Sequence, residues 1–368
     1  MKKWHILFTC LALSAAFVSC KLGRFVVYNF ADIKDYKKFP DRKLNKSETT
    51  FQFPASESPR APKNIHLKGD TIPFETFLEE NNTVAFIVLK NDSLLYEKYF
   101  NKYDESSVVA SFSMAKSVTS MLIGCAIEDG FIQSVEEPVT NYIPELKENG
   151  FDSVTIEHLL QMTSGLDYNE SYINPFGDAA TYYYGRHLRK AVTKLKLEHP
   201  PGTHFEYQSG STQVLGLILD RALKDKTLTE YLEEKIWLPL GMEYDASWSI
   251  DKKKDGLEKT FCCLNARARD FAKLGELYLH QGNWQGQQLV PETWVEQSTK
   301  IDTTNGSKWY YQYQWWLPTQ TGDFMAQGYL GQYIYVYPER DIVIVRLGKN
   351  NGDADWWTIL SMLGHAYK

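Results

Sequence analysis

Ser113 and Lys116 stand three residues apart in the segment Ser113-Met114-Ala115-Lys116, and the apolar residues that follow recur at helical spacing. Residues three apart share one face of a helix, so the hydroxyl and the amine should point into the same space. A lysine can accept the proton of a serine nucleophile when burial or a helix N-terminus lowers its pKa. The pair therefore predicts acyl transfer through a serine ester, with the Ser113 N–H facing the oxyanion. The alternative interpretation is a helix-capping serine followed by a solvated lysine.

Longer strings follow at 154–166 (VTIEHLLQMTSGL) and 200–209 (PPGTHFEYQS). With these companions, the chain from about residue 74 onward resembles the serine β-lactamase-related family. That family includes class C β-lactamases, D-alanyl-D-alanine carboxypeptidases, esterases and nylon-oligomer hydrolases. The resemblance implies an α/β (α+β) fold of the β-lactamase/DD-peptidase kind. In that fold, we expect an antiparallel sheet built from both chain ends, flanked by helices and carrying an inserted, mostly helical lobe.

The second motif of that family corresponds to Tyr207-Gln208-Ser209. The resemblance implies that Tyr207 shares proton transfer with Lys116. A phenol near an ammonium should ionise more easily, take a proton from Ser113 and pass one to the leaving group. Ser209 stands where the family usually has Asn, and orienting Lys116 or the substrate is its expected role. For Tyr207 the alternative is a packed aromatic residue.

The third motif, usually Lys-Thr-Gly or His-x-Gly, aligns with Gly328-Tyr329-Leu330-Gly331-Gln332. Tyr329 replaces the cation that helps to hold a substrate carboxylate in lactam-directed members. The second oxyanion donor is expected at the backbone N–H of Gln332, with Gly331 as the one-residue alternative. A glycine before the donor lets the backbone approach a ligand closely.

The third motif and the string Tyr168-Asn169-Glu170-Ser171-Tyr172 look more like the esterase and nylon-oligomer hydrolase branch. In that branch a Tyr and an Asp from this loop help to bind amide substrates. Tyr172 and Asp178 are the candidates, and a solvated loop is the alternative.

Three functions stay open at this point. The first is hydrolysis of a small ester, amide or peptide-like substrate through a Ser113 acyl-enzyme. The second is β-lactamase or D-alanyl-D-alanine carboxypeptidase activity, which the replacement at Tyr329 disfavours. The third is a sensor or binding protein without turnover. No metal or organic cofactor is implied, because side chains and backbone donors supply the chemistry.

The elements that must position these residues follow from apolar patterning. Strands are expected at 83–89 and 94–100, joined by the turn 91–93, and a helix from 113 to a stop at Gly130. The middle, 135–295, is mostly helical and loop-rich. Strands return at 311–317, 331–337 and 342–347, and a helix over 353–367 closes the chain. This order predicts one sheet made from both ends.

The N-terminus has the pattern of an export signal. Lys2 and Lys3 precede a short apolar run, which ends in Phe17-Val18-Ser19-Cys20. This resembles a bacterial lipobox, so we expect signal 1–20, a lipid anchor at Cys20, a tether over 21–71 and a catalytic domain over 72–368. A plain signal peptide is the alternative. The net charge of −6 argues against a nucleic-acid partner. Three further cysteines, Cys125, Cys262 and Cys263, are expected to be buried and unpaired.

Overall fold

The computed structural model describes residues 21–28, 30–60, 62–67 and 69–367, so the expected signal peptide and Cys20 lie outside the described residues. Its centre is an antiparallel sheet of order β13-β14-β15-β16-β17-β4-β5. In chain order these strands are β4 (Thr83–Lys90), β5 (Ser93–Tyr99), β13 (Tyr311–Gln312), β14 (Trp315–Trp316), β15 (Phe324–Gly328), β16 (Gln332–Tyr337) and β17 (Ile342–Gly348). Ile344 of β17 pairs with Val88 of β4. The predicted joining of both chain ends in one sheet is confirmed.

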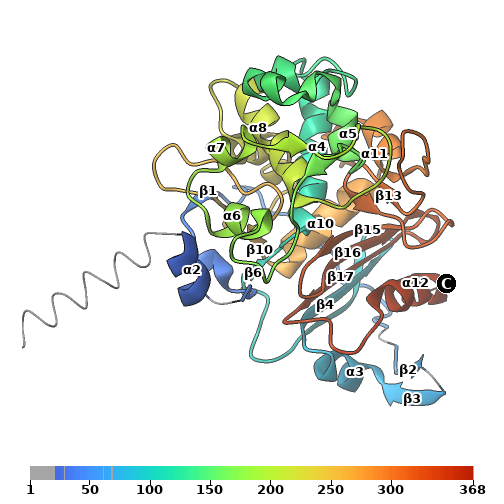
Figure 1. The fold of residues 1–368 in the computed structure, drawn as a ribbon. Coiled ribbons are helices and arrows are strands. Elements are labelled where there is room, and N and C mark those ends of the chain that lie inside the picture. Colours follow the sequence, from blue (N-terminus) through green and yellow to red (C-terminus); the bar gives the residue numbers. More distant parts are fainter. Residues whose placement is uncertain (1–20, 29, 61, 68, 368) are drawn as a thin grey trace, which may run out of the picture.

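Helices cover both faces of this sheet (Figure 1). Phe86 and Val88 of β4 join a core with α3 (Phe74–Glu80) and α12 (Trp356–Ala366). Ile87 and Leu89 point the other way, into the core that includes α4 (Met114–Glu128) and α10 (Ala268–Leu279). Successive side chains of a strand alternate between faces. Burial on both faces therefore explains why residues 84–89 are all apolar.

A mostly helical lobe, inserted between β5 and β13, stands at one end of the sheet (Figure 1). Helix α4 packs there against α8 (Ser209–Ala222), and α5 (Ile156–Leu160) packs against α8 as well. The remaining helices of the lobe are α6 (Asp178–Tyr184), α7 (Leu188–Val192), α9 (Leu228–Leu232), which runs into the π-helix η5 (Glu233–Trp237), and α11 (Glu292–Thr299). Short 3-10 turns are η1 (Asp35–Lys37), η2 (Val139–Asn141), η3 (Pro144–Asn149), η4 (Phe151–Ser153) and η6 (Pro338–Arg340).

Small sheets complete the fold: β2 (Asn64–Leu67) with β3 (Asp70–Pro73), β7 (Leu166–Asp167) with β8 (Lys196–Leu197), and β11 (Asn283–Trp284) with β12 (Gln287–Gln288). A further sheet has the order β1-β9-β10-β6, from β1 (Asp41–Leu44), β6 (Val109–Ala110), β9 (Ala246–Ser249) and β10 (Leu264–Ala266). In the part of the chain that the structure describes, no helix has both the length and the apolar character needed to cross a bilayer.

The segment 21–71 differs from the tether that we expected. Asp41 of β1 pairs with Ser249 of β9, and helix α2 (Lys21–Tyr28) contacts α6. Ile33 and Leu44 are buried in the main core. The frequent Lys, Asp and Pro of this segment indicated a spacer, but its few apolar residues are enough to fasten it to the lobe.

The cysteine expectation is wrong for one pair. Cys262 and Cys263 form a disulfide between adjacent residues, whereas Cys125 is buried and free as expected. The sequence analysis looked for disulfides that join distant segments, for which three cysteines are a poor set. A bond between adjacent cysteines joins no distant segments, so this argument did not detect it.

Candidate active site

The nucleophile candidate lies where a strained turn enters the central helix. Phe112, the residue before Ser113, has a left-handed backbone with φ of 46°, which is uncommon for a bulky side chain. Ser113 is the N-cap of α4. The N–H groups of Met114, Ala115 and Lys116 bond the carbonyls of residues 111–113, whereas no hydrogen bond of the Ser113 N–H occurs within the described chain. This N–H is therefore available to a substrate oxygen.

Lys116 lies directly behind Ser113. Its ammonium donates to the Ser113 Oγ at 3.1 Å, to the Ser209 Oγ at 3.1 Å and to the Phe261 carbonyl at 2.8 Å. The side chain is 1% exposed. Burial lowers the pKa of Lys116 to about 8, and the Glu170 carboxylate opposes that shift. With this pKa, about one molecule in ten carries the neutral amine at pH 7, and this fraction of general base rises as the pH approaches 8.

Tyr207 is brought to the same place, and its role differs from expectation. Its ring lies 5.1 Å from the Lys116 Nζ. Burial raises the pKa of Tyr207 well above its usual value, against the opposing effect of the nearby Ser113 side chain. The predicted easier ionisation of this phenol is therefore wrong, because desolvation outweighs any help from the neighbouring ammonium. Tyr207 stays protonated at neutral pH and can relay a proton.

Ser209, at the first turn of α8, connects Lys116 to a carboxylate that the sequence analysis missed. Its Oγ accepts from Lys116 and donates to the Glu170 Oε1 at 2.6 Å. The Ser209 N–H also donates to the Glu170 Oε2 at 2.7 Å. The expected orienting role of Ser209 thus takes the form of a Lys116–Ser209–Glu170 chain. The sequence offered one indication of Glu170, which is its place two residues before Tyr172 in the string 168–172.

In the third motif, the residue that reaches the site is not the one that the alignment predicted. Gln332 is fully buried in β16, where it pairs with Gly328 of β15, and it does not line the pocket that contains Ser113; its side-chain amide donates to the Gly348 carbonyl at 2.7 Å. A Cβ on Gly331 would lie 1.8 Å from a guanidinium nitrogen of Arg346. The glycine is therefore explained by packing against this arginine, and ligand approach is not needed to explain it.

Tyr329 is the residue of this motif that reaches the site. It lines a pocket of about 80 Å³ together with Ser113, and its ring contacts Phe112 and Tyr172. No hydrogen bond of its N–H occurs among the described residues. Gly328, just before it, approaches the Ser111 carbonyl so closely that a Cβ would lie 2.1 Å away. The N–H of Tyr329 is therefore a better candidate than that of Gln332 for the second oxyanion donor.

Of the two loop residues expected to bind substrate, the structure brings one to the pocket. Tyr172 lines it, is half exposed and donates to Glu170 at 2.7 Å. Asp178 begins α6 and accepts from the Asn169 N–H at 3.0 Å, which holds the loop rather than lining the pocket. The remaining wall is mostly apolar: Phe30, Ala31, Phe112, Ile173, Ala179, Ala180, Tyr183, Tyr184, Ser209, Phe261 and Cys262.

This constellation is suited to nucleophilic catalysis without a bound metal. Lys116 lies at hydrogen-bonding distance from Ser113, and the Tyr207 ring lies 5.1 Å from the Lys116 Nζ, beside an apolar pocket that Ser113 lines. In the described residues, the group of side chains with metal-ligand spacing is Asp92, Glu276 and His280, none of which lines this pocket.

Comparisons with known proteins agree with the geometry. The family model described as Beta-lactamase matches residues 74–356. The 6-aminohexanoate-dimer hydrolase of Paenarthrobacter ureafaciens is 29% identical over 299 residues, covering 74% of this chain and 74% of that protein. A solved Bacillus anthracis structure, provisionally described as a 6-aminohexanoate-dimer hydrolase, has a TM-score of 0.79 at 27% identity and covers 93% of this chain and 92% of that one. A family VIII carboxylesterase shares the fold, with a TM-score of 0.60 at 13% identity, covering 76% of this chain and 90% of that one.

Proposed function

Since this chain belongs to the Beta-lactamase family and is a serine hydrolase, we propose that it cleaves a linear amide or ester through an acyl-enzyme on Ser113. The observation that carries the proposal is the Lys116 ammonium, buried and bonded to the Ser113 Oγ at 3.1 Å. Its lowered pKa makes it the base that the serine needs.

The proposed reaction has two halves. Neutral Lys116 takes the Ser113 proton while Oγ attacks the substrate carbonyl, and the N–H groups of Ser113 and Tyr329 stabilise the oxyanion. The C–N or C–O bond then breaks, and Tyr207 gives its proton to the leaving group and recovers one from the Lys116 ammonium. In the second half, water attacks the ester while Lys116 accepts its proton; the ester C–O bond then breaks, and Lys116 returns this proton to the Ser113 Oγ, which releases the acid and restores the enzyme.

The pocket favours a slender acyl group with an apolar chain. Its volume is about 80 Å³, and aromatic residues such as Phe112, Tyr184 and Phe261 line it. The residue of the third motif that lines this pocket is Tyr329, which supplies an aromatic ring and not the cation with which lactam-directed relatives hold a substrate carboxylate. The likeness to 6-aminohexanoate-dimer hydrolase, whose name gives a dimer of an amino acid as its substrate, supports amides over β-lactams.

A substrate panel tests this proposal. We expect steady hydrolysis of p-nitrophenyl butyrate and of the linear 6-aminohexanoate dimer, and much slower hydrolysis of nitrocefin, with all activity lost in Ser113→Ala. If nitrocefin were the best substrate, the proposed function would have to change from amide or ester hydrolysis to β-lactamase activity. A burst without steady turnover would instead indicate a sensor.

We also propose export and a lipid anchor at Cys20. The Cys262–Cys263 disulfide supports this, because disulfides persist mainly outside the reducing cytoplasm. Metabolic labelling with palmitate should mark the wild-type chain and not Cys20→Ala; equal labelling would contradict the anchor.

A further inference from the structure

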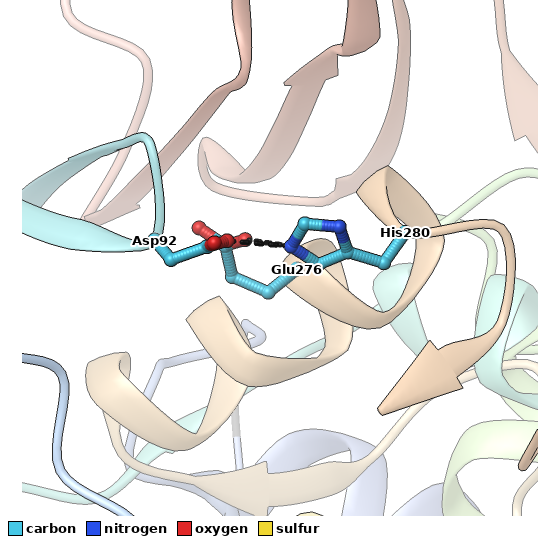
Figure 2. A group of neighbouring side chains, drawn as sticks. All are labelled: Asp92, Glu276 and His280. Atoms are coloured by element: carbon cyan, nitrogen blue, oxygen red, sulfur yellow. Dashed lines mark hydrogen bonds and ion pairs between the residues drawn. The ribbon is translucent and has the colours of Figure 1, made fainter. Parts of the chain in front are cut away.

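A second cluster of titratable side chains lies outside the catalytic pocket (Figure 2). Asp92 comes from the turn between β4 and β5, Glu276 lies on α10, and His280 is the C-cap of that helix, four residues later. The His280 Nε2 lies 2.5 Å from the Asp92 Oδ1 and 3.5 Å from the Glu276 Oε2. One donor atom from each residue lies within 4.8 Å of the other two. Figure 2 shows all three side chains pointing toward one another.

Glu276 is the unusual member. Its side chain is 1% exposed, its Oε1 has no hydrogen-bond partner among the described residues, and its Oε2 pairs with the His280 Nε2 at the long distance of 3.5 Å. An ionised carboxylate that is buried in this way is costly unless a cation compensates it. The cause of the burial is the close approach of α10 to the sheet, where a Cβ on Gly275 would lie 2.6 Å from a methyl of Val343. The fold therefore holds a buried carboxylate whose Oε1 is unpartnered among the described residues and whose Oε2 has only a long contact with His280.

The cluster faces a surface pocket of about 410 Å³. Asp92, Glu276 and His280 line it, and Phe51 and Trp284 pack edge to face on the same wall. Asp92 and His280 are partly exposed, so water and small ions can enter. This pocket shares no lining residue with the pocket at Ser113.

We propose that Asp92, Glu276 and His280 bind a first-row divalent cation, with Zn²⁺ the best match. One imidazole nitrogen and two carboxylates are ordinary zinc donors, and water would complete a tetrahedral set. Ligand atoms of such a set lie about 3.3 Å apart at normal Zn–N and Zn–O distances. The exposed Asp92 side chain, on a turn, can adjust to that spacing. Two carboxylates and a neutral imidazole balance the charge of the ion.

The proposed ion is structural and not catalytic. It joins the β4–β5 turn to α10, the helix that packs on β4, β16 and β17. A cation that binds the folded state and not the unfolded chain raises the unfolding midpoint. Ester hydrolysis at Ser113 should therefore not require it.

Calorimetric titration of the full-length protein with ZnCl₂ tests the proposal. The protein is purified without a polyhistidine tag and stripped with EDTA. We expect one equivalent to bind wild type and His66→Gln, the latter a matched control on β2 outside the cluster. His280→Gln and Asp92→Asn should lose this binding. Zinc should also raise the wild-type unfolding midpoint by about 3–6 °C at a hundredfold excess over its dissociation constant.

Two results would overturn the proposal. No uptake by wild type would mean that a proton on His280 alone balances the carboxylates. Equal uptake by wild type and His280→Gln would mean that zinc binds elsewhere. Because both substituted side chains are partly exposed, these variants should fold, and unchanged p-nitrophenyl butyrate hydrolysis will verify it.

Discussion

At the residue scale, the account depends on how Lys116 is held. Its three hydrogen bonds run to Ser113, Ser209 and the Phe261 carbonyl, and Glu170 reaches it through Ser209. The sequence predicted the Ser113–Lys116 pair, because helical spacing alone puts the two on one face. It did not predict Glu170, because that contact forms only where the loop before α6 meets the start of α8.

The lowered pKa of Lys116 sets the pH dependence. Since the neutral amine is the base and the pKa is about 8, kcat/KM should rise with pH and level off above about 8. Initial rates of p-nitrophenyl butyrate hydrolysis from pH 6 to 10, corrected for spontaneous hydrolysis, measure this. A rate that falls across the same range would contradict a lysine base.

Removal of the Glu170 charge should shift that profile. The carboxylate raises the pKa of Lys116 against burial, so in Glu170→Gln the pKa should fall further and the acidic limb should move to lower pH. Asp167→Asn, which removes an exposed charge from β7 in the same region, is the matched control and should leave the limb in place. A limb that stays fixed in Glu170→Gln would show that this carboxylate does not act on Lys116.

At the element scale, the long patterned segments were predictable and the short ones were not. The apolar run of β4 is sufficient to predict a strand, and the helical spacing of apolar residues in α4 is sufficient to predict a helix. In contrast, β15 has the sequence FMAQG, with no alternation, and is recognisable only when paired with β16. That missed hairpin is why the motif was assigned to Gln332, which lies opposite Gly328 in the ladder, while Tyr329 occupies the turn.

The loop that carries the disulfide should affect catalysis. Phe261 accepts from Lys116, and Cys262 lines the pocket next to it. In the double variant Cys262→Ser/Cys263→Ser the loop loses its covalent constraint, so we expect kcat to fall roughly tenfold to a hundredfold as the Phe261 carbonyl shifts. Cys125→Ser, a buried free cysteine, is the control and should retain kcat even if stability drops. An unchanged kcat in the double variant would remove the loop from the mechanism.

At the scale of the whole molecule, the N-terminal extension helps to build the site. Residues 21–71 pack on the lobe through α2 and β1, and Phe30 and Ala31 reach the pocket wall. The sequence predicted the sheet from both ends and the inserted lobe. It did not predict the role of the extension, whose composition is that of a linker and whose contacts depend on the position of α6 and β9.

Phe30 should contribute to selection of the acyl chain. It is 72% exposed at the pocket, so Phe30→Ser should fold normally while losing apolar contact with substrate. We expect the KM for p-nitrophenyl octanoate to rise about threefold to tenfold and the KM for p-nitrophenyl acetate to change little. Val27→Ser, which alters a 54% exposed side chain on α2 that does not line the pocket, should change neither KM. Equal effects of the two variants would refute a specific role for Phe30.

The most direct test of the central claim is to trap the acyl-enzyme nucleophile. Wild-type protein is incubated with a fluorophosphonate and digested, and the peptide that contains Ser113 is analysed by mass spectrometry. We predict one phosphonate adduct, located on Ser113, in wild type, no adduct in Ser113→Ala and strongly slowed labelling in Lys116→Met. An adduct on another serine, or equal labelling of wild type and Ser113→Ala, would contradict the account.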